Sequence, residues 1–75
     1  MTLAALKLGV EARVTALDGL PETEQLRLSA LGLAPGALVT KLMPTPLRDP
    51  VECLVDGQLL ALTNDLMARV FVEPR

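Results

Sequence analysis

The stretch that decides the fold is Leu31-Gly32-Leu33-Ala34-Pro35-Gly36, which places two backbone reversals side by side. Gly32 suits the left-handed conformation that ends a helix, and Leu33 can then fold back onto the last helical turn, as a Schellman-type ending requires. Pro35-Gly36 suits the centre of a type II turn, because proline fixes φ and the following glycine accepts a positive φ. We therefore predict that a helix ends here and that a strand begins directly afterwards.

Upstream of this stretch, the sequence predicts a strand and then a helix. Apolar residues alternate with others along residues 10–17 and define one face: Val10, Ala12, Val14 and Ala16. A period of two is typical of a half-buried strand. Pro21 suits the opening turn of a helix, which we expect to run from about Glu22 to Leu31.

Downstream, turn residues separate the remaining expected elements. We predict strands over residues 37–43 and 51–56, and Asp56-Gly57 is a hairpin signal that leads into a strand over residues 58–62. Thr63 can cap a short helical turn through about Ala68, and a last strand follows over residues 70–73. The residues expected to shape the turns are Gly32, Pro35, Gly36, Asp49, Pro50 and Gly57.

These elements predict a mainly β fold with five short strands, one helix in the N-terminal half and a helical turn before the last strand. A flat sheet of such strands would leave long edges unpaired, so we expect a small, partly open barrel of SH3-like architecture. The 75 residues contain no linker or repeat and are expected to form one domain, 1–75. Aromatic residues make up 1% of the chain, so the core should be aliphatic.

Charge and hydropathy limit the partners and the compartment. The formal net charge is -2 and the basic residues are scattered, which argues against nucleic-acid binding. No apolar run approaches the roughly 20 residues of a membrane span, and Leu3–Leu6 is too short for a signal sequence, so we expect a cytoplasmic protein without direct membrane insertion. The single cysteine, Cys53, fits a reducing compartment and is expected to be a small buried side chain.

The residues with reactive side chains do not form a catalytic or metal-binding pattern. The chain has no histidine and one cysteine, so a nitrogen or thiolate metal site is not expected. Carboxylates occur in pairs, Glu22 with Glu24 and Asp49 with Glu52, and we interpret both pairs as solvated surface. No nucleophile has an evident base, and no glycine-rich loop suits nucleotide phosphates. We predict no catalytic residue, no cofactor and no metal site, and therefore no enzyme.

Apolar residues at positions that should face water suggest a binding surface. On the helix, Leu28 and Leu31 form one apolar stripe while Leu26 and Ala30 form another on nearly the opposite side, and only one stripe can be buried well. Phe71 shares its side of the last strand with charged neighbours. Either the curved barrel buries part of both faces, or Leu26, Ala30 and Phe71 form an exposed patch for a protein partner or self-association.

An ordered series of segments resembles the FeoA family: Leu28-x-x-Leu31-Gly32-Leu33-x-Pro35-Gly36, Pro46-Leu47-Arg48-Asp49-Pro50, Gly57, Leu60-x-Leu62 and Val70-x-Val72. The resemblance extends from Leu3 to Glu73. It implies an SH3-like, noncatalytic accessory protein of bacterial ferrous iron uptake, placed in a family described as binding transition metal ions. The implied partner is FeoB, a membrane permease with a cytosolic GTPase domain, which would recruit the protein to the inner face of the membrane and whose activity it would modulate.

Two positions depart from the family pattern. Arg48 stands where the family commonly has glycine, so the loop has either another turn geometry or a new charge at its tip, and Arg48 joins the candidate partner surface. Thr63 stands where a basic residue is frequent.

A second function, from another class, is an SH3-like interaction or dimerisation module in iron-dependent transcriptional regulation. The chain lacks a helix-turn-helix, so it would act in trans. The sequence does not determine the oligomeric state, and a homo-oligomer is one of the alternatives.

Overall fold

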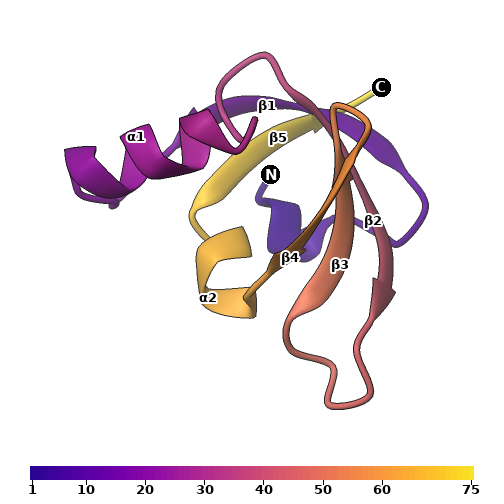
Figure 1. The fold of residues 1–75 in the computed structure, drawn as a ribbon. Helices are drawn as coiled ribbons and strands as arrows, with labels where there is room; N and C mark the ends of the chain where they lie inside the picture. The colour runs from indigo at the N-terminus through magenta and orange to yellow at the C-terminus, as the bar shows by residue number, and fades with distance from the viewer.

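The computed structural model describes all residues, 1–75, as one curved antiparallel sheet with the strand order β4-β3-β2-β1-β5 (Figure 1). The strands are β1 (Glu11–Leu17), β2 (Leu38–Pro44), β3 (Val51–Val55), β4 (Gln58–Leu62) and β5 (Val70–Pro74). A 3-10 helix, η1 (Leu3–Ala5), precedes the sheet; α1 (Glu22–Ala30) joins β1 to β2, and α2 (Asn64–Met67) joins β4 to β5. The predicted order of elements is confirmed, with each boundary within one residue of its expected place.

The end of α1 is the Schellman motif predicted from the sequence. Gly32 has a φ of 95°, in the left-handed region. The amide of Leu33 donates to the carbonyl of Leu28 at 2.9 Å, and the amide of Gly32 donates to the carbonyl of Ser29 at 2.9 Å. These are the two bonds that satisfy the last helical carbonyls in this motif. The chain leaves the helix with Leu33 fully buried, which anchors α1 to the core.

The two later reversals also follow their sequence signals. Gly36 has a φ of 95°, and the amide of Ala37 donates to the carbonyl of Ala34 at 3.0 Å, as in a type II turn. Asp56 and Gly57 have φ values of 46° and 86°, the two positive angles of a type I′ hairpin. The strands β2 and β4 begin directly after these turns, as predicted.

One strand departs from the predicted alternation. Ala12 and Val14 of β1 are buried as expected, whereas Ala16 is exposed and Leu17 is half-buried. The register of β1 against β5 shifts between Val14 and Ala16, because a β-bulge adds one residue to β1 at this point. An extra residue reverses which side chains face inward. The prediction that Ala16 shares the buried face was therefore wrong.

An aliphatic core fills the inside of the curved sheet. The two helices and the N-terminal segment each contribute side chains to it, namely Leu28, Met67, Leu3 and Leu6. Cys53 is buried in this core, as predicted. Lys41 is the buried charged residue, and its Nζ donates to the carbonyls of Ala4 at 3.1 Å and Leu6 at 2.8 Å.

Candidate functional site

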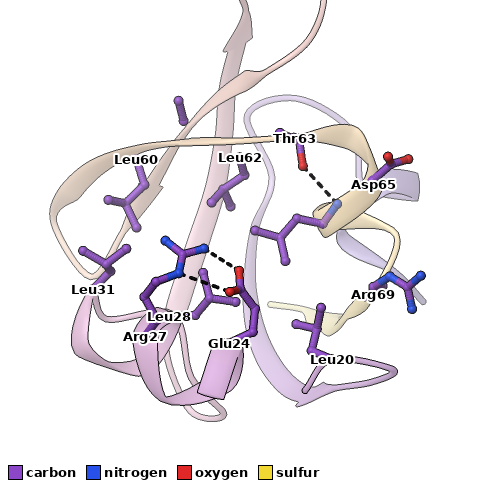
Figure 2. A pocket seen from close by; sticks show the side chains of 12 residues that line it. Leu20, Glu24, Arg27, Leu28, Leu31, Leu60, Leu62, Thr63, Asp65 and Arg69 are labelled. Atoms are coloured by element: carbon purple, nitrogen blue, oxygen red, sulfur yellow. Dashed lines mark hydrogen bonds and ion pairs between the residues drawn. The ribbon is translucent and has the colours of Figure 1, made fainter. Parts of the chain in front are cut away.

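The largest hollow of the molecule lies between α1, β4 and α2 and has a volume of about 340 Å³ (Figure 2). We call this hollow the leucine groove because leucines make up most of its apolar lining. They are Leu20, Leu28, Leu31, Leu60, Leu62 and Leu66. Figure 2 shows the labelled leucines of this set turned toward a common space, namely Leu20, Leu28, Leu31, Leu60 and Leu62. The groove is therefore an apolar surface assembled from segments that are far apart in the sequence.

Local structure explains how each wall of the groove is held. Leu28 is buried, and Leu31, three residues later on the same face of the helix, remains 41% exposed. Leu60 and Leu62 both point to the inner side of β4, because alternate residues of a strand share a face. The hydroxyl Oγ1 of Thr63 accepts a hydrogen bond from the Leu66 amide at 3.2 Å, which confirms the predicted helix cap.

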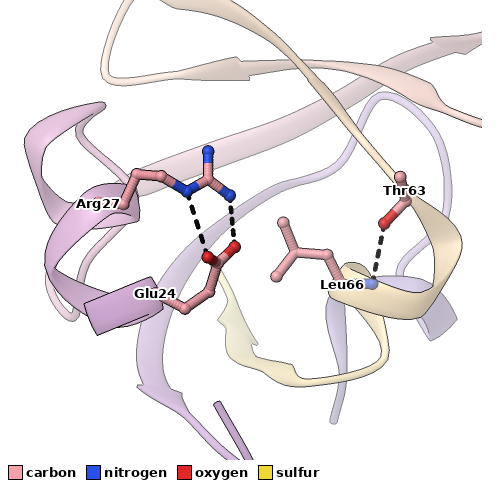
Figure 3. A network of polar contacts seen from close by, with 4 residues as sticks. All are labelled: Glu24, Arg27, Thr63 and Leu66. Carbon is pink, nitrogen blue, oxygen red and sulfur yellow. Dashed lines mark hydrogen bonds and ion pairs between the residues drawn. The ribbon is translucent and has the colours of Figure 1, made fainter. Parts of the chain in front are cut away.

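Charged side chains surround the groove without an excess of either sign. Arg27 donates two hydrogen bonds to the carboxylate of Glu24, one turn away on α1 (Figure 3). The hydrogen bond from Arg27 lowers the pKa of Glu24 below its ordinary value. Arg69 donates to the carbonyl of Gly19 at 3.2 Å. Neither Asp65 nor Arg69 takes part in an ion pair, so one charge of each sign is unpaired at the groove.

The residues predicted to form a partner surface do not line this groove. Leu26 is 64% exposed and lines a second hollow, of about 300 Å³, with residues of the β1 end and the Ala34-Pro35 turn. Ala30 is exposed on α1, and Phe71 is half-buried in β5, where it pairs with Ala16. No hollow is lined by more than one of the predicted residues.

Of the two apolar stripes predicted on the helix, one lines the leucine groove. This stripe consists of Leu28 and Leu31. The sequence had left open whether it or the stripe of Leu26 and Ala30 would be buried. The signal for the groove was thus present in the i, i+3 leucines and in Leu60-x-Leu62. Sequence alone could not indicate that these segments meet.

Arg48 lies in the loop between β2 and β3 and adopts a φ of 65°, the left-handed conformation that glycine favours. The loop is held against the start of α2, since Asp49 Oδ1 accepts from the Asn64 amide at 2.9 Å and Asn64 Nδ2 donates to the Arg48 carbonyl at 3.4 Å. The peptide bond between Asp49 and Pro50 is cis. Arg48 therefore holds a left-handed conformation at the position where the family resemblance leads us to expect glycine, and it lies on a loop bonded to α2.

The paired carboxylates occupy separate environments. Glu24 is held by Arg27, whereas Glu22 lines the hollow on the other side of α1. Asp49 accepts its hydrogen bond from α2. No three His, Cys, Asp or Glu side chains gather in a group that could hold a metal ion. Neither helix has the length and apolar character needed to cross a bilayer.

Comparisons with known proteins agree with this architecture. Residues 1–74 match the FeoA domain. The FeoA protein from Chlorobium tepidum has 34% identity and a TM-score of 0.89, over 99% of this chain and 70% of that chain. Stenotrophomonas maltophilia FeoA, described as an SH3 domain protein complexed with zinc, has 29% identity and a TM-score of 0.79, over 97% of this chain and 89% of that chain.

A further solved structure shares the fold at lower identity. T. acidophilum IdeR is 21% identical with a TM-score of 0.82, over 100% of this chain and 34% of that chain, which shows the fold alone. No curated protein matches the sequence. The match over residues 1–74 and the similarity to the Chlorobium tepidum protein show that this chain belongs to the FeoA family, which has an SH3-like fold and is associated with ferrous iron transport.

Proposed function

We propose that this protein is a noncatalytic cytoplasmic accessory factor of ferrous iron uptake that docks on an FeoB-type permease and modulates its activity. Membership of the FeoA family supports the link to iron transport. The observation that carries the docking proposal is the leucine groove, whose lining is mostly apolar and includes two acidic and two basic residues. An apolar centre with a polar rim is the usual arrangement of a protein interface.

The residues of the leucine groove favour binding over chemistry. Its hydroxyl, on Thr63, caps α2, and its guanidinium and carboxylate on α1 are bonded to each other. No nucleophile lies beside a general base there, which covalent catalysis would need. The protein would act by binding one state of the permease better than another, because a ligand shifts a conformational equilibrium only through such a difference in affinity.

A titration tests this proposal. Labelled protein is titrated with the cytosolic fragment of the permease in GDP, in a nonhydrolysable GTP analogue and without nucleotide. Binding whose affinity depends on the nucleotide supports docking coupled to the GTPase cycle. Absence of binding in all three conditions contradicts docking on this fragment.

Two matched variants locate the docking surface. Leu31→Asp places a charge in the leucine groove, and we expect it to weaken binding by about tenfold or more, because a charge in an apolar interface loses its hydration. Leu26→Asp makes the same change on the other face of α1 and tests the surface predicted from Leu26, Ala30, Phe71 and Arg48. Weak binding by Leu26→Asp with normal binding by Leu31→Asp would move the site to that predicted surface.

A role in transcriptional control is the second candidate, because the fold is shared with IdeR. A pull-down from cell extract separates the two functions. Retention of an iron-dependent repressor, with no retention of the permease, would favour the second.

A further inference from the structure

One edge of the sheet has backbone groups without partners. β4 pairs only with β3, in a register that sets Val55 opposite Gln58 and continues residue by residue to Val51 opposite Leu62. In an antiparallel hairpin of this kind, every second residue bonds to the neighbouring strand. The amides and carbonyls of Leu59 and Ala61 therefore face away from β3, and no other backbone hydrogen bond involves them.

The opposite edge of the sheet is protected. The amide of Val72 in β5 donates to the carbonyl of Met1 at 2.8 Å, and Thr2 forms a bridge to Phe71. β4 lacks the charged residues, prolines and bulges that usually protect an edge strand. Its sequence, Gln58-Leu59-Leu60-Ala61-Leu62, contains no charge and no proline, and its pairing with β3 contains no bulge.

We propose that β4 pairs with β4 of a second copy of this chain, antiparallel, about a twofold axis at Leu60. This register sets Leu59 of each copy opposite Ala61 of the other, so the four outward amides donate to the four outward carbonyls. Across such an axis, residues at or beside Leu60 lie close to the equivalent residues of the second copy, so a charge there would meet a like charge. Residues 57–64 contain no charged side chain, so this contact brings no like charges together.

The side chains of β4 fit the same arrangement. Leu59, 66% exposed in one copy, packs beside Ala61 of the second copy on the outer face of the joined sheet. Leu60 faces the inner side, where it is part of the leucine groove, and meets Leu60 of the second copy there. A contact of one short strand buries less surface than a standard interface, so the dimer is weak and forms at high protein concentration.

Amide hydrogen exchange measured by NMR tests the pairing residue by residue. At two protein concentrations about a hundredfold apart, mass action shifts the monomer-dimer equilibrium. We expect the exchange of the Leu59 and Ala61 amides to slow severalfold at the higher concentration, while the amides of Gln58, Leu60 and Leu62 are protected at both. Sedimentation should show the dimer over the same range. Unchanged exchange at Leu59 and Ala61, with or without a dimer, overturns the proposal.

Variants of β4 separate this contact from any other dimer. Ala61→Pro removes an outward amide and leaves the bonds to β3 in place, because proline is tolerated where its nitrogen faces away from the ladder. Leu59→Asp places two like charges diagonally across the twofold axis, one from each copy. Leu26→Asp is the matched control on α1, with 64% exposure against 66% for Leu59. We expect the first two to sediment as monomers and the control to dimerise.

Retention of the dimer in both β4 variants, with folding verified by circular dichroism, overturns the proposal. The dimer does not rest on permease docking, which the titration measures separately.

Discussion

At the scale of single residues, Arg48 has a backbone angle that glycine favours, at a position where the FeoA family pattern commonly has glycine. The FeoA pattern commonly has glycine at this position, and the structure gives Arg48 a φ of 65°. An L-residue with a side chain in this conformation costs about 1–2 kcal/mol. Arg48 therefore holds a backbone conformation that glycine adopts with less strain.

We expect Arg48→Gly to raise the free energy of unfolding by roughly 0.5–1 kcal/mol, since relief of the left-handed strain exceeds the entropy that glycine adds to the unfolded chain. Urea unfolding followed by circular dichroism measures this change. Gly32→Ala is the matched control, because its φ of 95° should make the added side chain destabilising by a similar amount. A loss of stability in Arg48→Gly would mean that the arginine side chain makes a compensating contact.

At the scale of elements, Lys41 joins β2 to the N-terminal segment. The sequence placed Lys41 in a strand without distinguishing it from the exposed lysine, Lys7. In the structure its ammonium group is buried and bonds to the carbonyls of Ala4 and Leu6, in and directly after η1. This side chain holds the segment that places Leu3 in the core.

Lys41→Met should lower the free energy of unfolding by about 1–3 kcal/mol, because it keeps most of the side-chain volume and leaves the buried Leu6 carbonyl and the partly buried Ala4 carbonyl without this donor. Lys7→Met, at an exposed position, is the control and should change stability by less than about 0.5 kcal/mol. Chemical denaturation compares the two variants, and equal effects would show that Lys41 does not tether η1.

At the scale of the whole molecule, the buried thiol of Cys53 makes the free energy of unfolding depend on pH in the alkaline range. Burial raises the pKa of this thiol, and the positive charge of Lys41 opposes the shift in part. The unfolded chain therefore loses the thiol proton first, near its ordinary pKa of about 8.5. The stability that this group contributes is complete below that value and is lost as pH rises toward the folded pKa.

We predict that the free energy of unfolding falls above about pH 8.5, with a slope of at most about 1.4 kcal/mol per pH unit from this group. The chain has no tyrosine to titrate in the same range. Cys53→Ala should be less stable at neutral pH, because it leaves a small cavity, and should show a flatter profile above pH 8.5. Denaturation curves from neutral to alkaline pH measure both effects, and parallel profiles for the two proteins would contradict the assignment.

The sequence by itself determined the local structure of this protein. Gly32, Pro35-Gly36, Asp56-Gly57 and Thr63 set their turns and caps through backbone angles and hydrogen bonds within a few residues, which a linear pattern contains. Their order also carried the resemblance to the FeoA family, and with it the fold class, which the comparisons confirm.

Only the tertiary structure decided which surfaces are buried and which meet. The bulge in β1 that exposes Ala16 arises from pairing with β5, at the other end of the chain. The leucine groove joins Leu31 to Leu60 and Leu66, and the free edge of β4 exists because no later strand pairs with it. The physical reason is that burial and edge exposure depend on contacts between distant segments, whereas periodicity and turn chemistry report only on neighbours along the chain.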